Sequence, residues 1–211
     1  MSKLLTTTLL LLLAPFLAVA QTAVTASEQE RIITEINAAA KDVHTIQCDF
    51  TQTKTLSIMD DRLVSRGSMI FAQPSRLRWC YTSPYSYTFI ITDDKVHIAK
   101  GSQRSSIDLH SSQAFQELAR LMAGSVTGQC LTSKSDFDVT ILADANSYIA
   151  QLRPKDKRLR KLFATIRLTF DRQTRTMREV LLTEPGGDTT TITLHNVRQN
   201  QTVNAKVFSL D

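Results

Sequence analysis

Histidine, serine, cysteine and acidic residues are the side chains of this sequence that could bind a metal or attack a substrate. The segment Gly124–Gly128 reads Gly-Ser-Val-Thr-Gly, so valine stands where a G-x-S-x-G nucleophile elbow requires serine. The histidines show no H-x-H or H-E-x-x-H spacing, so a metal site would require distant segments to converge. They are His44, His97, His110 and His195. We therefore expect no enzyme activity, no metal and no cofactor.

The carboxylates and cysteines support the same expectation. Aspartates are adjacent at 60–61 and at 93–94, and neighbouring residues of a strand point to opposite faces. Each pair is therefore typical of a polar turn and not of a catalytic dyad. The three cysteines, Cys48, Cys80 and Cys130, are odd in number and lack C-x-x-C spacing. They are predicted to be structural or free thiols, and the sequence leaves open whether two of them pair.

The most informative apolar pattern lies between Pro74 and Pro84. Leu77, Trp79 and Tyr81 alternate there, which places them on one face of a β-strand. The opposite face carries the intervening residues Arg76, Arg78 and Cys80. A strand in a filled hydrophobic core would show the same alternation, so the neighbouring segments must decide its role.

The first twenty residues have the features of a secretory signal. Lys3 precedes an apolar run centred on Leu9–Leu13, and Ala18-Val19-Ala20 forms an A-x-A cleavage site. The apolar run is too short for a membrane span, and the small residues after it favour cleavage over an uncleaved anchor. We predict cleavage after Ala20 and export of one domain, residues 21–211, to the periplasm.

Charge and length narrow the class of protein further. The formal net charge is +5, and it becomes +4 without the predicted signal, in which Lys3 is the only charged residue. This bias is too small to indicate nucleic-acid binding without a focused patch. A mature chain of about 190 residues suits one core and one domain. We expect a monomer that does not bind nucleic acid.

Alternating apolar residues and turn signals predict two helices and two runs of strands. The first helix runs from Ser27, which forms a capping box with Glu30, to about Val43. The second follows the serines at 111–112 and ends at Gly124. The predicted strands are Thr45–Leu56, Ser65–Ala72, Arg76–Tyr81, Tyr87–Thr92, Lys95–Lys100, Phe137–Leu142, Ser147–Leu152, Leu162–Phe170, Thr176–Thr183 and Thr189–Val197.

These elements predict a mainly β fold with a few helices. A sheet of about ten or eleven strands curls strongly, and two helices cannot cover both of its faces. The expected architecture is an open antiparallel half-barrel lidded by helices. Its concave apolar face would form a pocket of the kind that holds apolar ligands.

A series of short segments extends over essentially the whole mature chain. They are Phe50-Thr51-Gln52, Gly67, Pro74 with Leu77-Arg78-Trp79, Pro84, Asp93-Asp94-Lys95-Val96, the second helix near Leu118, Phe170-Asp171 and Asn204–Phe208. Their order and spacing resemble the outer-membrane lipoprotein carrier family, the LolA-like periplasmic chaperones. The resemblance implies an open half-barrel that carries the acyl chains of lipoproteins from the inner to the outer membrane and catalyses no reaction.

The resemblance also implies partners. Acylated lipoproteins would be the cargo, an inner-membrane lipoprotein-releasing transporter the donor, and an outer-membrane protein the acceptor. Alternatives that keep the fold are an envelope sensor of misplaced lipoproteins and a carrier of another apolar ligand, such as a glycolipid or pigment. A hydrolase of envelope lipids is a third class, and it would need a serine or cysteine nucleophile paired with histidine.

Transferred position by position, the resemblance places Leu77, Trp79 and Phe89 in the wall of the acyl-chain cavity. Period-2 spacing adds Ile46, Cys48, Phe50, Tyr81 and Ile91 from the same strands. The second helix would form the roof with Leu118, Leu121 and Met122. Each acyl methylene removed from water contributes roughly 0.8 kcal/mol, and release requires that the lid open at modest cost.

One position departs from the family pattern. In the family an arginine directly before the proline of this motif hydrogen-bonds toward the helices and holds the lid shut, whereas this chain has Gln73. Glutamine is neutral but keeps a donor and an acceptor, so we predict a weaker lid contact.

The strongest charge feature is a basic run in the second half of the chain. It contains Arg153, Lys155, Lys157, Arg158, Arg160 and Lys161. Both a solvated loop between strands and an electrostatic guide toward acidic partners or anionic headgroups fit this run. No glycine-rich cradle accompanies it, so phosphate chemistry is not indicated.

Overall fold

A computed structural model describes most of the chain. The described residues are 21–59, 61–109, 124, 128–133 and 135–210. The predicted signal and most of the predicted second helix, with its roof residues Leu118, Leu121 and Met122, lie outside the described residues.

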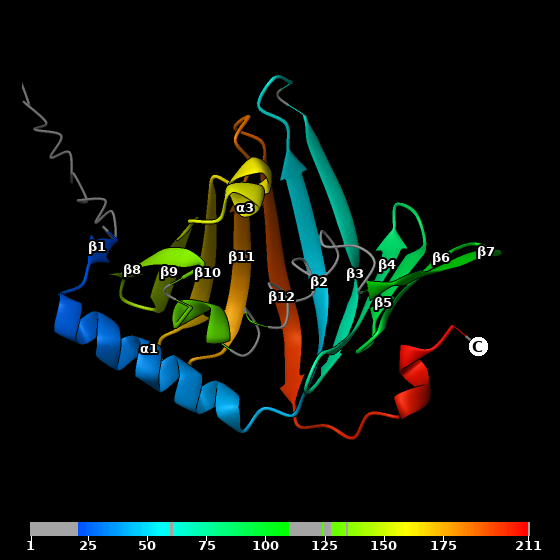
Figure 1. Cartoon of the computed structure of the whole chain (residues 1–211), viewed down its shortest axis with the longest axis horizontal. Helices are drawn as coiled ribbons and strands as arrows, with labels where there is room; N and C mark the ends of the chain where they lie inside the picture. Colours follow the sequence, from blue (N-terminus) through cyan, green and yellow to red (C-terminus); the bar gives the residue numbers. More distant parts are fainter. Residues whose placement is uncertain (1–20, 60, 110–123, 125–127, 134, 211) are drawn as a thin grey trace, which may run out of the picture.

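The fold is one antiparallel sheet of twelve strands, and its two edge strands do not meet (Figure 1). Across the sheet the strands follow the order β1-β8-β9-β10-β11-β12-β2-β3-β4-β5-β6-β7. One half contains β2 (Thr45–Thr55), β3 (Arg62–Ala72), β4 (Arg76–Ser83), β5 (Tyr87–Ile91), β6 (Lys95–Lys100) and β7 (Gln103–Asp108). The other contains β1 (Thr22–Ala23), β8 (Phe137–Ala143), β9 (Ser147–Pro154), β10 (Thr165–Asp171) and β11 (Met177–Thr183). β12 (Thr189–Gln199) joins the halves because it pairs with β11 on one side and β2 on the other.

The predicted fold class, mainly β with an open antiparallel half-barrel, is confirmed with twelve strands instead of ten or eleven. The strands that sequence reasoning missed are β1 and β7. β1 has only two residues, and every residue of β7 except Ile107 is exposed, so β7 lacks an apolar alternation. β3 also begins three residues earlier than predicted, at Arg62.

Helix α1 (Ala26–Lys41) has its N-cap two residues before the predicted one, Ser27. Thr25 is the N-cap: its hydroxyl accepts the Glu28 amide, and the Glu28 carboxylate accepts the Thr25 amide. The predicted Ser27–Glu30 box is therefore wrong, because Ser27 already lies inside the first turn. The remaining helices bounded within the described residues are α3 (Lys157–Leu162) and two short 3₁₀ helices, η2 (Gln129–Leu131) and η3 (Ala205–Phe208).

α3 corrects the interpretation of the basic run as a loop. Asp156 caps the helix, since its carboxylate accepts the backbone N–H groups of Arg158 and Leu159. Leu159 is 3% exposed and anchors α3 to the sheet. The predicted strand from Leu162 consequently begins at Thr165.

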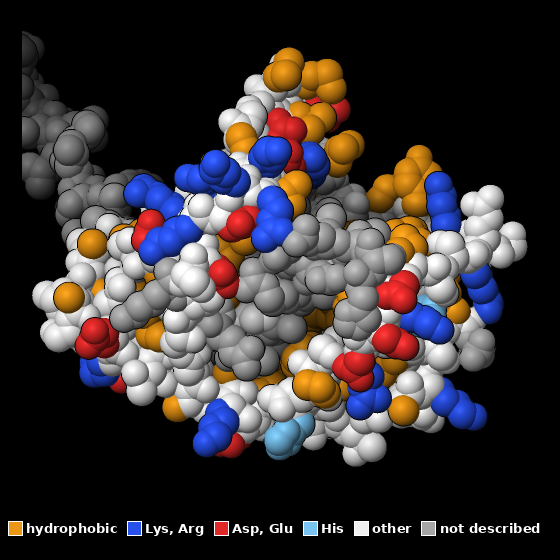
Figure 2. All heavy atoms as spheres, in the orientation of Figure 1, with side chains coloured by type: hydrophobic (Ala, Val, Ile, Leu, Met, Phe, Trp, Pro, Cys, Tyr) orange, Lys and Arg blue, Asp and Glu red, His pale blue; other side chains and the backbone are white. Residues whose placement is uncertain are grey.

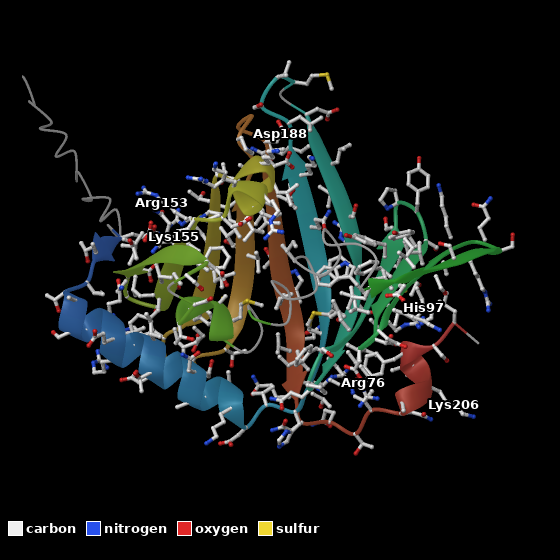
Figure 3. All side chains as sticks on the ribbon, viewed as in Figure 1. Arg76, His97, Arg153, Lys155, Asp188 and Lys206 are labelled. Atoms are coloured by element: carbon white, nitrogen blue, oxygen red, sulfur yellow. The ribbon has the colours of Figure 1, made fainter. Side chains whose placement is uncertain are left out.

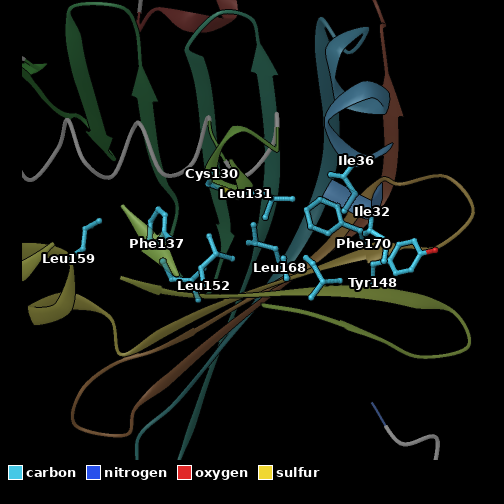
Figure 4. Close-up of a cluster of buried hydrophobic side chains, with 13 residues drawn as sticks. Ile32, Ile36, Cys130, Leu131, Phe137, Tyr148, Leu152, Leu159, Leu168 and Phe170 are labelled. Carbon is cyan, nitrogen blue, oxygen red and sulfur yellow. The ribbon is translucent and has the colours of Figure 1, made fainter. Parts of the chain in front are cut away.

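One large apolar cluster lies between α1 and β8 to β11, and Figure 4 shows it from close by. Ile32 and Ile36 are the buried residues of α1, each 1% exposed, and they fall on one helical face because they are four residues apart. Their partners include Phe137, Tyr148, Leu152, Leu168 and Phe170 from the sheet and Leu131 from η2. We call this region, with its strands, the α1 half.

The C-terminal segment covers the other face of β4 and β5. Phe208 packs with the fully buried Ile90, the Arg76 guanidinium lies 5.5 Å from the Phe208 ring centre, and Arg78 Nη1 donates to the Val207 carbonyl at 2.9 Å. The prediction that Arg76 and Arg78 oppose the tryptophan stripe is therefore confirmed.

Candidate ligand-binding site

The predicted cavity residues outside the second helix come together in one apolar cluster on β2, β4 and β5. Ile46, Cys48, Phe50, Leu77, Trp79 and Ile91 are all at most 7% exposed, and Tyr81 and Phe89 pack against them partly buried. We call the cluster formed by these eight residues and their apolar neighbours the wall. Their assembly is a feature of the structure, and their contact with a ligand stays a prediction.

The wall includes residues that sequence reasoning missed. Met69 and Phe71 of β3 pair in register with Cys48 and Ile46 on one side and with Trp79 and Leu77 on the other. Their own alternation in the predicted strand was the signal that could have found them. Further members are Val43, Val96 and Leu109, with Ile98, Ile192, Leu194 and Val197 partly buried against them.

Aromatic rings form the centre of the wall. The Phe50 and Trp79 ring centres are 4.2 Å apart, and the Tyr81 ring meets Phe50 edge to face at 5.2 Å. Tyr87 extends the row, with its ring centre 6.0 Å from that of Tyr81. Such offset and edge-on pairs stabilise each other beyond their burial.

Gly67 makes this arrangement possible. It pairs with Phe50 across β2 and β3, and a Cβ atom built on it would lie 2.7 Å from Phe50 Cζ and 2.0 Å from the Cys80 carbonyl oxygen. Only glycine allows the strand and the ring to approach so closely.

The wall carries few polar groups. The Tyr81 hydroxyl donates to Gln52 Oε1 at 2.9 Å, and burial raises the pKa of Tyr81 above its usual value. Burial, with a smaller contribution from Asp49, raises the pKa of the Cys48 thiol to about 12. Trp79 Nε1 is buried near the Tyr81 hydroxyl, yet it makes no hydrogen bond of good geometry in the described chain. At neutral pH the wall is therefore uncharged, with one N–H group available to an acceptor.

A cavity of about 40 Å³ lies at the seam between the wall and the α1 half. Ile36 and Ala40 of α1 line it together with Ile46, Met69 and Leu194. Pockets for drug-sized ligands are roughly 300–1,000 Å³, so an acyl chain would have to widen this seam.

An ionic cluster fixes α1 near the seam. Arg175, in the turn between β10 and β11, binds Glu35 through Nε at 3.0 Å and Nη2 at 2.6 Å, and Arg31 binds the other Glu35 oxygen. These bonds, first the one from Arg175, lower the pKa of Glu35. The Arg175 guanidinium also lies 5.1 Å from the Tyr148 ring centre.

Comparison with known proteins identifies the family of this chain. A family model described as "Outer membrane lipoprotein carrier protein LolA" matches residues 41–211. The chain belongs to the LolA family. This match confirms the resemblance seen in the sequence. The description of the family names a carrier and no catalysed reaction. No curated protein matches the chain.

Solved structures share the LolA-family fold at low identity. MucB in the Pseudomonas aeruginosa MucA/MucB complex is 12% identical with a TM-score of 0.50, covering 87% of this chain and 61% of that chain. A second MucB structure is 14% identical with a TM-score of 0.53, at 88% and 64% coverage. Mycobacterium tuberculosis lipoprotein LppX is 11% identical with a TM-score of 0.50, at 85% and 99% coverage. The chain thus spans less than two thirds of the MucB chains, and the likeness shows the fold.

Gln73 contacts the segment that follows α1. Its Nε2 donates to the Val43 carbonyl at 2.8 Å, and its backbone N–H donates to the His44 carbonyl. Asn200 holds the same segment, since it accepts the His44 amide and donates to the Asp42 carbonyl. These bonds fix Gln73 to the segment between α1 and β2, and a lid contact of Gln73 stays a prediction.

The described chain offers little for other chemistry. It contains no group of three or more His, Cys, Asp or Glu side chains arranged to hold a metal ion, and its three cysteines are free thiols. His97 contacts Ser106 and His195 contacts Thr51, far apart on the sheet. No described helix is long and apolar enough to cross a membrane.

Proposed function

We propose that this protein is a periplasmic carrier that binds the acyl chains of lipoproteins against the wall and moves them from the inner to the outer membrane. The observation that carries the proposal is the uncharged apolar wall centred on Trp79, in a chain of the LolA family. Its partners would be acylated lipoproteins, an inner-membrane releasing transporter and an outer-membrane acceptor, and the carrier would act as a monomer.

The wall and the seam suit reversible binding. An acyl chain gains roughly 0.8 kcal/mol for each methylene that leaves water. Trp79 Nε1, which has no good partner in the described chain, could donate to a carbonyl at the head of an acyl chain. Entry would require the end of α1 to move from the seam, and the segment after it is held by a neutral hydrogen bond from Gln73 to the Val43 carbonyl.

Binding of a fluorescent fatty-acyl probe tests the proposal. Trp79→Ala should weaken probe binding roughly ten-fold, because it removes the largest ring of the wall. Tyr85→Ala is the matched control: Tyr85 is 76% exposed in the turn between β4 and β5 and should leave affinity unchanged. Equal affinity of Trp79→Ala and wild type, with both folded by circular dichroism, would refute an acyl site at the wall.

Carriage of another apolar ligand and envelope sensing are the second candidates. They are supported by fold likeness to LppX, a lipoprotein, and to MucB, which was solved together with MucA. Mass spectrometry of native protein from the periplasm separates them. A bound lipoprotein supports the carrier, a glycolipid or pigment changes the cargo, and apo protein held by an envelope protein favours a sensor.

A further inference from the structure

Three features meet at one end of the sheet, which we call the rim: the β2–β3 hairpin, the β11–β12 hairpin and α3. The strand register places them there, since Thr55 pairs with both Arg62 and Thr189, and Thr183 pairs with both Thr189 and Thr165, just after α3. Figure 1 shows all three at the top of the view. The end of α1 and the turn between β3 and β4 lie at the opposite end.

The β2–β3 hairpin exposes apolar side chains beyond the rest of the sheet. Ile58 is 95% exposed and Met59 54%, and Leu63 and Val64, on opposite faces of β3, are 54% and 41% exposed. In Figure 2 this tip is the apolar group at the top of the molecule. Single exposed apolar residues are ordinary, but a projecting apolar tip such as Ile58-Met59 is typical of a surface that meets another apolar phase.

Cations stand beside the apolar tip. Arg153, Lys157, Arg160 and Lys161 are exposed on and near α3, and no ion pair of theirs occurs among the described residues. Leu162, 49% exposed, adds an apolar side chain to the same helix. Figures 2 and 3 show Lys and Arg gathered below the tip, with Arg153 and Lys155 on the α3 side.

Part of the rim charge is neutralised within the protein. Lys155 binds Asp138, Arg158 binds Asp156, and Lys54 binds Glu184. Asp188 accepts hydrogen bonds from the backbone and hydroxyl of Ser57. Among the described rim residues, the four unpaired cations outnumber Asp61, the exposed hairpin carboxylate without an ion pair, so the surface keeps a positive balance.

We propose that the rim docks on the surface of an anionic phospholipid bilayer, with Ile58 and Met59 among the headgroups and the α3 cations facing lipid phosphates. An apolar tip flanked by Lys and Arg is the combination that binds such interfaces, because each part alone binds weakly. The wall lies on the sheet between its two ends, so membrane binding and acyl binding are separable.

Flotation with vesicles tests the docking. Wild-type protein should float with vesicles containing phosphatidylglycerol and not with vesicles of phosphatidylcholine alone, and salt should reduce the bound fraction. Ile58→Ser/Met59→Ser should lower binding at least about five-fold. Lys157→Gln/Arg160→Gln/Lys161→Gln should lower it further, at roughly five-fold for each cation.

A matched charge control uses three exposed cations from the opposite end of the sheet. Lys41→Gln/Lys95→Gln/Arg198→Gln removes the same net charge and should bind vesicles like wild type. Equal loss in both triple variants would reduce the effect to net charge and overturn the docking surface. Failure of wild type to float with any vesicle would also overturn it. Unchanged acyl-probe affinity in the rim variants keeps the outcome separate from that of the proposed function.

Discussion

The α1 half and the wall are both apolar, yet they are completed differently. The α1 half is closed by its own helix, with Ile32 and Ile36 packed on the sheet and Glu35 held by Arg175. No residue of α1 or α3 belongs to the wall, which within the described chain is built from strands and their connecting segments. A helix therefore completes one half, whereas strands and their connecting segments build the described part of the other. Because Trp79 is the only tryptophan, its fluorescence reports on the wall alone.

The largest expected effect is the loss of stability when a side chain is added at Gly67, beneath the Phe50 ring of the wall. Gly67→Ala should destabilise the fold by roughly 4 kcal/mol or more, because the new Cβ would meet the Cys80 carbonyl at 2.0 Å. Urea unfolding followed by Trp79 fluorescence measures this. Gly186→Ala is the matched control, since nothing lies within 4 Å of its Cβ, and it should stay within about 0.5 kcal/mol of wild type. Wild-type stability of Gly67→Ala would show that the ring does not pack on Gly67.

Truncating one leucine in each half sharpens the comparison. Leu168→Ala in the α1 half should cost about 3 kcal/mol of unfolding free energy and leave the affinity for an acyl probe unchanged. Leu77→Ala in the wall should also destabilise, and it should in addition weaken probe binding several-fold. The distinction between the halves fails if both variants change the affinity equally.

Acid should weaken the α1 half first. Hydrogen bonds to Arg175 lower the pKa of Glu35, and hydrogen bonds from Thr174 lower that of Asp171. A carboxyl whose folded pKa is lowered contributes stability that is complete above its unfolded pKa, roughly 4, and is lost as pH falls through the folded value. Amide exchange of α1 should therefore rise below about pH 4 before Trp79 emission shifts. The reverse order would contradict the assignment.

The smallest expected effect comes from Glu35→Gln. It removes the ionic bonds of Arg175 and Arg31 while keeping the side-chain shape, so amide exchange in α1 should accelerate at neutral pH. Glu30→Gln, on the same helix and with no ion pair of its carboxylate among the described residues, is the control and should exchange like wild type. If the seam admits the ligand, Glu35→Gln should also speed the release of an acyl probe.

The sequence predicted residues of the wall, but it did not predict the ion pair that fixes α1 near the seam. The alternation of Leu77, Trp79 and Tyr81 is a local property of one strand, so it survived into the structure. The clamp between Glu35 and Arg175 joins residues 140 positions apart, and no spacing rule predicts such a contact.

Two further differences between prediction and structure, at α3 and at the start of α1, concern helix capping. α3 was hidden because six residues carry too little apolar periodicity, although Asp156 before them was a helix-start signal. At α1, two overlapping capping boxes competed, and Thr25 prevailed over Ser27.

The central position of β12 also bears on how the molecule assembles. Without this strand the hydrogen-bonded order would separate into two sheets, β1 with β8 to β11 and β2 to β7. β12 pairs with β2 between residues as far apart as Gln199 and Ile46, so the ladder closes only after most of the chain is present. Pairing over such sequence distances is slow, and we expect the continuous sheet to form after synthesis and not during it.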